Sequence, residues 1–408
     1  MKLLFLAADK FPPFRVDVAV LFAQELAGRG HEIEWILQAE NENNGSYKTL
    51  WHGNPVWVGA TDNGLSFWHR LKKHFFDFKN DFRVFKLATI NDYDFIQVKD
   101  KFLTAIIAII AAKKNDSTFI YWLSYPFPEA SLIRARNGTA RYPFFYFLRG
   151  YFFTWLLYKI ILPRAGHVFV QSEQMKSNLH LKGISLDKMT SVPMSISFQE
   201  VLAVQRKPLA SSGSSSDPVI LYLGTLARVR KLEFLLEVLV QVKKRVANAR
   251  LYFVGDGNEL SDRRFLQAEA ERLGVNDSVV FTGFVPMEKA WEYIRLANVC
   301  VSPMYPSFIL NCASPTKLIE YLAFGKPVVV NEHPEQSIIL AESKSGYCVP
   351  YDVGAFATAI IKLLKNPQKA ESMGKNGREY VKKSRDYPAI AAMVENKYQQ
   401  ILANFDKR

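Results

Sequence analysis

Residues 2–37 read K-L-L-F-L-A-A-D-K-F-P-P-F-R-V-D-V-A-V-L-F-A-Q-E-L-A-G-R-G-H-E-I-E-W-I-L. The apolar run Lys2–Ala8 predicts a strand that is buried on both faces of a parallel sheet. Apolar residues at helical spacing predict a helix over Val18–Arg29, and Glu32–Leu37 is the next strand. A strand, a helix and a second strand in this order form a βαβ unit, whose crossover is right-handed. This stretch therefore predicts a doubly wound α/β sheet at the start of the chain.

The same alternation continues along the chain and restarts once. In the first half it predicts three further strands, Phe95–Val98, Phe119–Trp122 and His167–Gln171. The Ser-rich stretch Pro208–Pro218 has no apolar periodicity and is typical of a flexible linker. Beyond it the alternation predicts five more strands, Val219–Leu223, Arg250–Val254, Ser278–Thr282, Val299–Pro303 and Pro327–Val330.

The predicted fold class is therefore α/β, with two Rossmann-like, doubly wound parallel-sheet domains that face each other across a cleft. We expect the first domain over residues 1–207, the linker over residues 208–217 and the second domain over residues 218–384. The length of 408 residues agrees with two domains that each bury a core.

Composition and charge exclude several classes of protein. A chain that is 49% hydrophobic is too apolar to be mainly disordered. Its three cysteines show no C-x-x-C spacing, which disfavours a disulfide framework or a zinc ribbon and favours a reducing compartment. The apolar run Leu3–Ala8 is too short for a secretory signal, so we expect a cytoplasmic protein. The formal net charge of +13 predicts an anionic partner.

Two aromatic segments indicate which anionic partner to expect. Phe67–Lys86 contains seven aromatic residues and six Lys or Arg, and Tyr142–Pro163 contains ten aromatic residues and no acid. Aromatic rings combined with cationic groups are typical of segments that lie in a membrane interface, whereas the alternative is an aromatic-rich core helix with a solvated basic face. We therefore expect contact with an anionic membrane surface and no nucleic acid, because the cations do not follow one face of the protein.

Other chemistries find no support in the sequence. The seven histidines lack the H-x-x-x-H or H-E-x-x-H spacing of a helical zinc site. The chain also lacks a G-x-S-x-G nucleophile elbow and a G-x-x-x-x-G-K-[ST] phosphate loop. We expect neither a metal site nor a bound cofactor.

The strongest candidate site is Ser314–Val328, which reads S-P-T-K-L-I-E-Y-L-A-F-G-K-P-V. Ser314 is predicted to cap a helix whose first residue is Pro315, and Gly325 is predicted to end it. The free N–H groups at such a helix start bind anions well.

Three side chains near this helix start suit a polar, anionic ligand. Lys317 adds a cation in the first turn, where it is unfavourable unless an anion is bound. Thr316 and Glu320 lie on one face, so that Glu320 can accept hydrogen bonds from the hydroxyl groups of a ribose. The alternative is an ordinary helix in which Glu320 pairs with Lys317.

A second candidate anion site, Gly224–Lys231, follows the first strand of the second domain. Three cations within four residues at the carboxyl end of a strand suit a diphosphate, although a solvated run of charge is the alternative. The G-D-G sequence at Gly255 also follows a strand at its carboxyl end, where a glycine loop can approach a ligand closely.

These residues carry a resemblance to a known family. The region Val219–Ser384 resembles the nucleotide-sugar domain of retaining glycosyltransferase family 4, which has the GT-B fold. The matching motifs, in the family's order, are V-I-L-Y-L-G-T-L-A-R-V-R-K-L-E-F-L-L-E, L-Y-F-V-G-D-G, V-V-F-T-G-F-V-P and S-P-T-K-L-I-E-Y-L-A-F-G-K-P-V-V. The first half is similar, with M-K-L-L-F-L-A-A-D-K-F-P-P, E-L-A-G-R-G-H-E-I-E-W and H-V-F-V-Q-S-E-Q-M-K.

The resemblance implies roles for individual residues. It implies that Arg228 and Lys231 hold the donor diphosphate and act in catalysis together with Glu320, which holds the ribose hydroxyl groups. It also implies that the base is bordered by Phe284 and Val285, and that residues 314–316 offer backbone N–H groups to phosphate or sugar. The full set of expected donor-binding residues is Gly224, Gly255, Phe284, Val285, Ser314, Pro315, Thr316 and Lys317. The resemblance further implies a C-terminal helix, residues 385–408, that packs back toward the first domain.

The chain departs from the family pattern at three places. Cys312 stands where the family usually has a second Glu, and Phe14–Asp17 replaces the usual Gly-Gly loop. The usual first-domain His is absent from the sequence Y-W-L-S-Y-P-F-P-E. We predict that polar residues at the strand ends of the first domain take over the acceptor side, with Asp17, Asp100, Lys101 and Glu129 as candidates.

The sequence therefore predicts a metal-independent retaining glycosyltransferase at the inner face of the plasma membrane. We expect a UDP- or GDP-linked sugar as the donor and a lipid-linked or cell-envelope polysaccharide as the acceptor. Two alternatives stay open: a non-catalytic membrane scaffold that keeps a nucleotide-sugar pocket, and a sugar-nucleotide epimerase or phosphorylase on the same fold.

Overall fold

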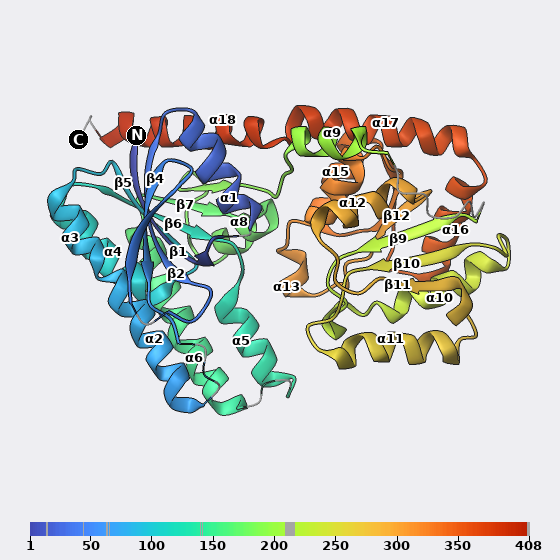
Figure 1. Ribbon diagram of the computed structural model, residues 1–408, viewed down its shortest axis with the longest axis horizontal. Coiled ribbons are helices and arrows are strands. Elements are labelled where there is room, and N and C mark those ends of the chain that lie inside the picture. Colours follow the sequence, from blue (N-terminus) through green and yellow to red (C-terminus); the bar gives the residue numbers. More distant parts are fainter. Residues whose placement is uncertain are drawn as a thin grey trace. The chain divides into compact units, whose positions relative to one another are not determined.

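The computed structural model describes residues 1–13, 15–43, 45–62, 64, 66–138, 140, 142–208 and 217–405. The chain divides into two compact units (Figure 1). Unit 1 contains residues 1–193 and 387–408, and unit 2 contains residues 194–386.

Unit 1 is built on an eight-stranded sheet with the order β3-β4-β2-β1-β5-β6-β7-β8. All neighbouring strands are parallel except β3 and β4, which form an antiparallel pair at one edge. The strands are β1 (Lys2–Phe11), β2 (Glu32–Ala39), β3 (Tyr47–Trp51), β4 (Asn54–Gly59), β5 (Phe95–Lys99), β6 (Thr118–Leu123), β7 (His167–Val170) and β8 (Met189–Ser191).

Helices connect and cover these strands. They are α1 (Val16–Ala19), η1 (Leu21–Leu26), α2 (Phe67–Asp81), α3 (Arg83–Ile90), α4 (Phe102–Lys114), α5 (Phe127–Arg136), α6 (Pro143–Trp155), η2 (Leu156–Ile161), α7 (Leu162–Arg164), α8 (Glu173–His180) and the C-terminal α18 (Tyr387–Phe405). Helix α18 joins the core of unit 1 through Tyr387, Val394 and Tyr398, which pack with residues of β1 and β2. Each large apolar side chain buried in this way stabilises the fold by about 1.5–3 kcal/mol.

Unit 2 is built on a six-stranded, fully parallel sheet with the order β11-β10-β9-β12-β13-β14. Its strands are β9 (Val219–Leu223), β10 (Arg250–Val254), β11 (Val279–Phe281), β12 (Val299–Ser302), β13 (Val328–Asn331) and β14 (Gly346–Val349). The helical segments are α9 (Phe198–Arg206), η3 (Arg228–Arg230), α10 (Glu233–Lys243), α11 (Leu260–Arg272), η4 (Asn276–Ser278), α12 (Met287–Leu296), α13 (Phe308–Asn311), α14 (Thr316–Ala323), α15 (Pro334–Ser343), α16 (Val353–Leu364) and α17 (Pro367–Ser384). Two apolar clusters, one containing Leu235 and Phe356 and the other containing Leu318 and Trp291, hold these helices to the sheet.

Both sheets have the doubly wound topology that the sequence predicts, and the fold class is confirmed. The domain boundary lies elsewhere than predicted. The compact units divide at Pro193 and not at residue 207, because Phe198, Val201 and Val204 of α9 pack in a core cluster of unit 2. Most of the predicted linker, residues 209–216, lies outside the described residues. The cleft between the domains stays a prediction.

The strand orders show where each sheet can bind a ligand. In unit 1, β2 lies on one side of β1, whereas β5, β6, β7 and β8 follow one another on the other side. The order in which strands are added to the sheet therefore reverses between β1 and β5. In unit 2 the corresponding reversal lies between β9 and β12. In open α/β sheets, ligands bind beyond the carboxyl ends of the strands at this reversal.

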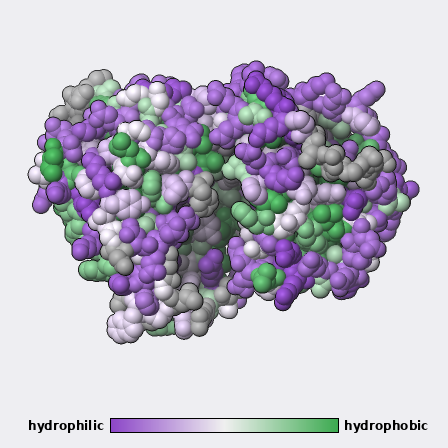
Figure 2. All heavy atoms as spheres, viewed as in Figure 1, coloured by the Kyte–Doolittle hydropathy of each residue, from purple (hydrophilic) through white to green (hydrophobic). Residues whose placement is uncertain are grey.

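The predicted aromatic segments form surface helices in unit 1. Helix α6 exposes most of its large side chains, with fractional exposures that reach 83% at Phe144. The exposed set is Phe144, Phe145, Phe147, Leu148, Tyr151, Phe152 and Trp155, together with the capping residue Tyr142. The following η2 instead buries Leu156, Leu157 and Ile161. The core-helix alternative therefore describes η2 but not α6. Most of the remaining surface on the face shown in Figure 2 is hydrophilic.

None of the helices in the described ranges combines the length and the apolar character that a membrane span requires.

Candidate functional site

Two glycines form the floor of the site at the carboxyl edge of the second sheet. Gly224 follows β9 and Gly255 follows β10, and both have φ near +130°, which other residues rarely adopt. A Cβ atom at Gly224 would lie 2.9 Å from the Lys317 ammonium nitrogen, and one at Gly255 would collide with the Gly224 carbonyl. Glycine at both positions therefore allows α14 and the strand ends to approach closely.

Helix α14 is fixed against these strand ends. Its Tyr321 hydroxyl accepts a hydrogen bond of 2.7 Å from the Leu223 N–H and lies 3.4 Å from the Val301 carbonyl. The apolar face of α14, including Leu318 and Leu322, is completely buried. The first turn of α14 is therefore held at the reversal between β9 and β12.

Lys317 is the unusual side chain of this edge. Its ammonium nitrogen is buried, lies 3.8 Å from the centre of the Tyr222 ring and has no hydrogen-bond partner within the described chain. Burial lowers the pKa of Lys317 well below its ordinary value, the nearby charge of Arg230 lowers it further, and Glu320 opposes the change. A buried amine without a hydrogen bond is costly, and an anion bound to this nitrogen would reduce that cost.

Glu320 does not neutralise Lys317 by direct contact. Its carboxylate accepts a hydrogen bond of 3.0 Å from the Trp291 indole, and burial raises its pKa while Trp291 and Lys317 oppose the rise. The alternative in which Glu320 pairs with Lys317 is therefore wrong, because the Lys317 nitrogen bonds no carboxylate of the described residues.

In the basic turn that follows β9, the cation nearest the candidate site is not one of the two that the sequence suggests. Arg228 is exposed, and its guanidinium lies 4.1 Å from the Phe265 ring centre. Lys231 is also exposed and has a left-handed backbone with φ of +53°. Arg230, which sequence reasoning did not select, is the cation whose charge lowers the pKa of both Tyr222 and Lys317. Its position in the run R-V-R-K was the only available signal.

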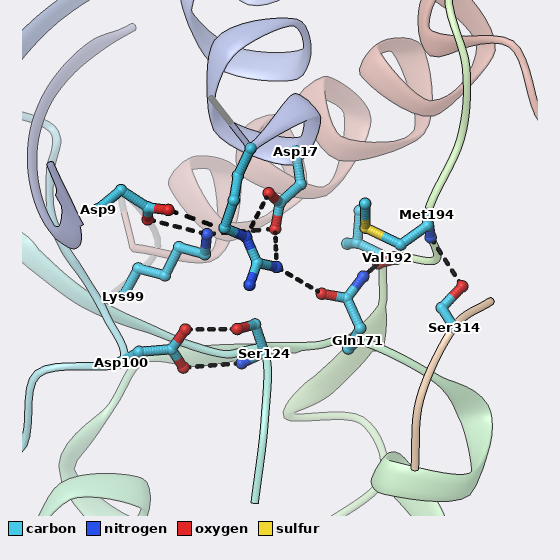
Figure 3. Close-up of polar contacts among 10 residues, drawn as sticks. Asp9, Asp17, Lys99, Asp100, Ser124, Gln171, Val192, Met194 and Ser314 are labelled. Carbon is cyan, nitrogen blue, oxygen red and sulfur yellow. Dashed lines mark hydrogen bonds and ion pairs between the residues drawn. The ribbon is translucent and has the colours of Figure 1, made fainter. Parts of the chain in front are cut away.

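The start of α14 differs from the prediction at Ser314 and Pro315. The helix begins at Thr316, and Pro315 occupies the capping position without a side-chain cap. The Ser314 hydroxyl instead donates to Glu335 at 2.7 Å. It also accepts a hydrogen bond of 2.9 Å from the Met194 N–H (Figure 3). Ser314 is therefore not the helix cap, because a buried carboxylate and a backbone N–H occupy its hydroxyl group. Gly325 ends the helix as predicted, with φ of +69°.

A pocket of about 580 Å³ in unit 2 is lined by the turns that follow β9 and β10, and its lining includes no residue of α14. It brings together four of the predicted donor-binding residues, Gly224, Gly255, Phe284 and Val285. Phe284 is 85% exposed, so its ring is available to a planar ligand. Cys312, which replaces the family's second Glu, is buried, and its thiol lies 3.3 Å from the Phe308 carbonyl.

The carboxyl edge of the first sheet carries a network of ion pairs, which we call the first-sheet cluster: Asp9, Arg15, Asp17 and Lys99. Lys99, at the end of β5, lies 3.1 Å from Asp9 and 3.2 Å from Asp17 (Figure 3). Arg15 binds Asp17 through two hydrogen bonds of 3.0 and 2.8 Å. Burial opposes the charge on Asp17, but Lys99 and Arg15 lower its pKa to about 2.

The four acceptor-side candidates fall into different places. Asp17 belongs to the first-sheet cluster, and Asp100 lies beside it, where both its oxygens accept hydrogen bonds from Ser124. Lys101 instead contacts α2 through Asp77 and Asp81, and Glu129 accepts a hydrogen bond of 2.6 Å from Tyr158. Sequence reasoning missed Asp9, Arg15 and Lys99, although Lys99 ends a strand next to Asp100.

The fold and these sites define a class of protein. Two doubly wound sheet units, of which the second is fully parallel, characterise the GT-B class of fold. Residues 205–380 match the model of the family described as "Glycosyl transferases group 1".

Curated proteins are similar to part of the chain. A GDP-mannose-dependent alpha-(1-6)-phosphatidylinositol monomannoside mannosyltransferase from Mycolicibacterium smegmatis is 30% identical over 171 residues, which cover 41% of this chain and 44% of that protein. The matched segments of this and a second curated relative span 44% and 57% of their lengths.

Solved structures resemble nearly the whole chain. Sucrose-phosphate synthase from Thermosynechococcus elongatus superposes with a TM-score of 0.72 at 19% identity, covering 99% of this chain and 100% of that one. Anabaena HepE in complex with UDP gives 0.69 at 15% identity, covering 98% and 100%. At these identities the likeness shows the GT-B fold alone.

Proposed function

We propose that this protein is a retaining glycosyltransferase whose unit 2 binds a nucleotide-diphosphate sugar, with UDP or GDP as the nucleotide. The observation that carries the proposal is the Lys317 ammonium, which is buried without a hydrogen bond beside Gly224 and Arg230. A diphosphate supplies the negative charge and the acceptor oxygens that this nitrogen lacks.

The donor can be placed by the chemistry of each side chain. The diphosphate would lie between Gly224 and the first turn of α14, where Thr316 and Lys317 contribute, with Arg228 and Lys231 at the rim. Glu320 would accept hydrogen bonds from the ribose, and the base would border Phe284 and Val285. The names of similar proteins support this donor class, since one relative is GDP-mannose-dependent and one structural neighbour holds UDP.

The proposed chemistry is electrostatic. The bond between the anomeric carbon and the diphosphate breaks, and the acceptor hydroxyl oxygen forms the new bond to that carbon. The hydroxyl proton leaves with the diphosphate, whose developing charge is stabilised by Lys317, Arg230 and the helix start.

Nucleotide binding and turnover test this proposal in two stages. We expect one of the two nucleotides, UDP or GDP, to raise the unfolding temperature of the wild-type protein more than the other. We also expect the protein to release UDP from UDP-glucose or GDP from GDP-mannose. Arg230→Gln and Glu320→Gln should each lower the affinity for the nucleotide and the rate of nucleotide release at least tenfold. Lys344→Gln, which changes an exposed lysine of unit 2, is the control and should change neither. Binding without release from any donor would favour the scaffold alternative, and conversion of the donor sugar without an acceptor would favour an epimerase.

We further propose that the acceptor is a lipid-linked or cell-envelope polysaccharide reached at the inner face of the plasma membrane. The support is the exposed aromatic face of α6, together with the basic residues Lys72, Lys73 and Lys79 on α2. The mannosyltransferase relative is likewise named for a phosphatidylinositol substrate.

Flotation with liposomes tests this membrane contact. Wild-type protein should float with vesicles that contain phosphatidylglycerol at low salt, and the double change Phe144→Ser and Phe145→Ser should abolish flotation. Leu181→Ser removes an equally exposed apolar side chain of the same unit and should leave flotation intact. Failure of wild-type protein to float at low salt would contradict the proposal.

A further inference from the structure

The first-sheet cluster is balanced in charge. Lys99 and Arg15 supply two positive charges, and Asp9 and Asp17 supply two negative charges within ion-pair distance. This balance contrasts with the carboxyl edge of unit 2, where Lys317 and Arg230 lie together without a bonded carboxylate on Lys317. An anion approaching the first-sheet cluster would meet carboxylates as well as cations, so the cluster does not favour a charged ligand.

Only part of this cluster reaches the surface. The side chains of Lys99 and Asp17 are 1% and 4% exposed, whereas those of Asp9 and Arg15 are 10% and 35% exposed. Lys99 and Asp17 therefore form the buried part of the cluster and bond the other two side chains. Asp9 and Arg15 are the members that a ligand can touch.

Arg15 is fixed in a geometry that leaves one edge available. Its Nε and Nη2 atoms bond Asp17, and Nη2 also lies 3.5 Å from the Gln171 side-chain oxygen. Within the described chain, its Nη1 atom bonds no other residue. A guanidinium held on two sides presents this third nitrogen as an oriented donor.

Asp9 provides the complementary group. One of its oxygens lies 3.1 Å from Lys99, and the other lies 3.8 Å from the Arg15 Nε atom, a longer contact that leaves room for another donor. An oriented donor next to an available carboxylate oxygen matches a sugar hydroxyl group, which both donates and accepts hydrogen bonds.

We propose that the first-sheet cluster binds the acceptor through uncharged sugar hydroxyl groups, with Asp9 accepting and Arg15 donating. Asp17 and Lys99 act as positioning residues that keep this pair in place. The proposal rests on the proposed glycosyltransferase function and deepens it, because it assigns the acceptor end as a neutral sugar and not as a phosphate or another anion.

Acceptor-stimulated release of UDP or GDP tests the assignment. The donors are UDP-glucose and GDP-mannose, and the acceptor probes are octyl glycosides of neutral hexoses together with the 6-phosphates of the same hexoses. We expect at least one octyl glycoside to stimulate release by wild-type protein, and the hexose 6-phosphates to stimulate it at least tenfold less.

Variants separate binding of the acceptor from general damage. Asp9→Asn and Arg15→Gln should raise the KM for the octyl glycoside at least tenfold, whereas the KM for the donor, which unit 2 binds, should change less than twofold. Asp77→Asn is the matched control, because Asp77 bonds Lys101 as Asp9 bonds Lys99, but away from the cluster. Its KM for the octyl glycoside should stay unchanged.

Three results would overturn the inference: equal or better stimulation by the 6-phosphates, an unchanged acceptor KM in both variants, or no stimulation by any octyl glycoside while the donor is still hydrolysed. These results differ from failure of the proposed function, in which wild-type protein binds neither UDP nor GDP and releases neither from a donor. That outcome would remove this inference as well.

Discussion

The carboxyl edges of the two sheets use lysine in opposite ways. In unit 1, Lys99 is almost completely buried and bonds two carboxylates. In unit 2, the Lys317 nitrogen is also buried but bonds no carboxylate of the described residues, and it lies 3.8 Å from the centre of the Tyr222 ring. Both lysines lie at the strand-order reversal of their sheet, where ligands are expected.

The presence or absence of a carboxylate partner distinguishes a structural buried lysine from one that is a candidate for binding a ligand. A buried cation with carboxylate partners is costly to remove, because its loss leaves those carboxylates buried and uncompensated. A buried amine without partners costs stability until an anion arrives. The same substitution at the two positions should therefore have different consequences.

Lys99→Met should produce the largest effect. The change leaves Asp9 and Asp17 without their shared cation, so we expect the free energy of unfolding of unit 1 to fall by about 3–5 kcal/mol. Urea unfolding followed by tryptophan fluorescence measures this loss. A loss below about 1 kcal/mol would show that Arg15 alone compensates both carboxylates.

Lys317→Met should weaken nucleotide binding without destabilising the protein. Removing a charge-assisted bond to phosphate should cost about 2 kcal/mol, roughly a 30-fold increase in the Kd of UDP or GDP. Because methionine replaces a buried amine that has no hydrogen bond, the unfolding temperature of the free protein should stay the same or rise. Calorimetric titration and thermal unfolding of the same sample check both parts, and a fall in stability would break the comparison.

The pH dependence of binding should sharpen the contrast. Burial lowers the pKa of Lys317 in the free protein, and a bound diphosphate would raise it, so the lysine takes up a proton on binding. Affinity for UDP or GDP should therefore fall as pH rises between these two pKa values, by at most tenfold per pH unit. Titrations in buffers with different ionisation enthalpies measure the proton uptake. The Lys317→Met protein should lose this component, and its persistence there would assign the uptake to another group.

Arg228→Gln should have the smallest effect. Its guanidinium is exposed and rests on Phe265, so we expect a loss of about 0.5–1 kcal/mol in nucleotide affinity, two- to fivefold in Kd. A loss as large as that of Arg230→Gln would mean that Arg228 reaches the diphosphate directly.

Several features of the fold could be predicted because they depend on local pattern. Apolar runs such as Lys2–Ala8 and Val219–Leu223 identify strands buried on both faces, and both are central strands. The antiparallel strands β3 and β4 were missed, although His52 and Gly53 form a two-residue turn with positive φ between them. Alternating residues around such a turn are a recognisable hairpin signal.

The candidate site of unit 2 was predicted in outline but not in detail. Gly224, Gly255, Phe284 and Val285 meet at one pocket, as their motifs suggest. The prediction that Ser314 caps α14 was wrong, because the Ser314 hydroxyl bonds Glu335, which lies 21 residues further along the chain. On the first sheet, Asp17 and Asp100 were identified, whereas Asp9 and Lys99 were not, because ion pairs between separate strand ends leave no local pattern.

The sequence alone determined two doubly wound sheets and the glycine turns that follow their strands, because strand burial, helix periodicity and glycine turns are properties of neighbouring residues. Only the tertiary structure decided which cations face inward and which are neutralised. The charge of Arg230 acts on Lys317, whereas Lys231, which has a left-handed backbone, is exposed. Lys99 bonds carboxylates, whereas Lys317 bonds none of the described residues. Charge balance at a site depends on distances between residues far apart in sequence, and those distances exist only once the chain is folded.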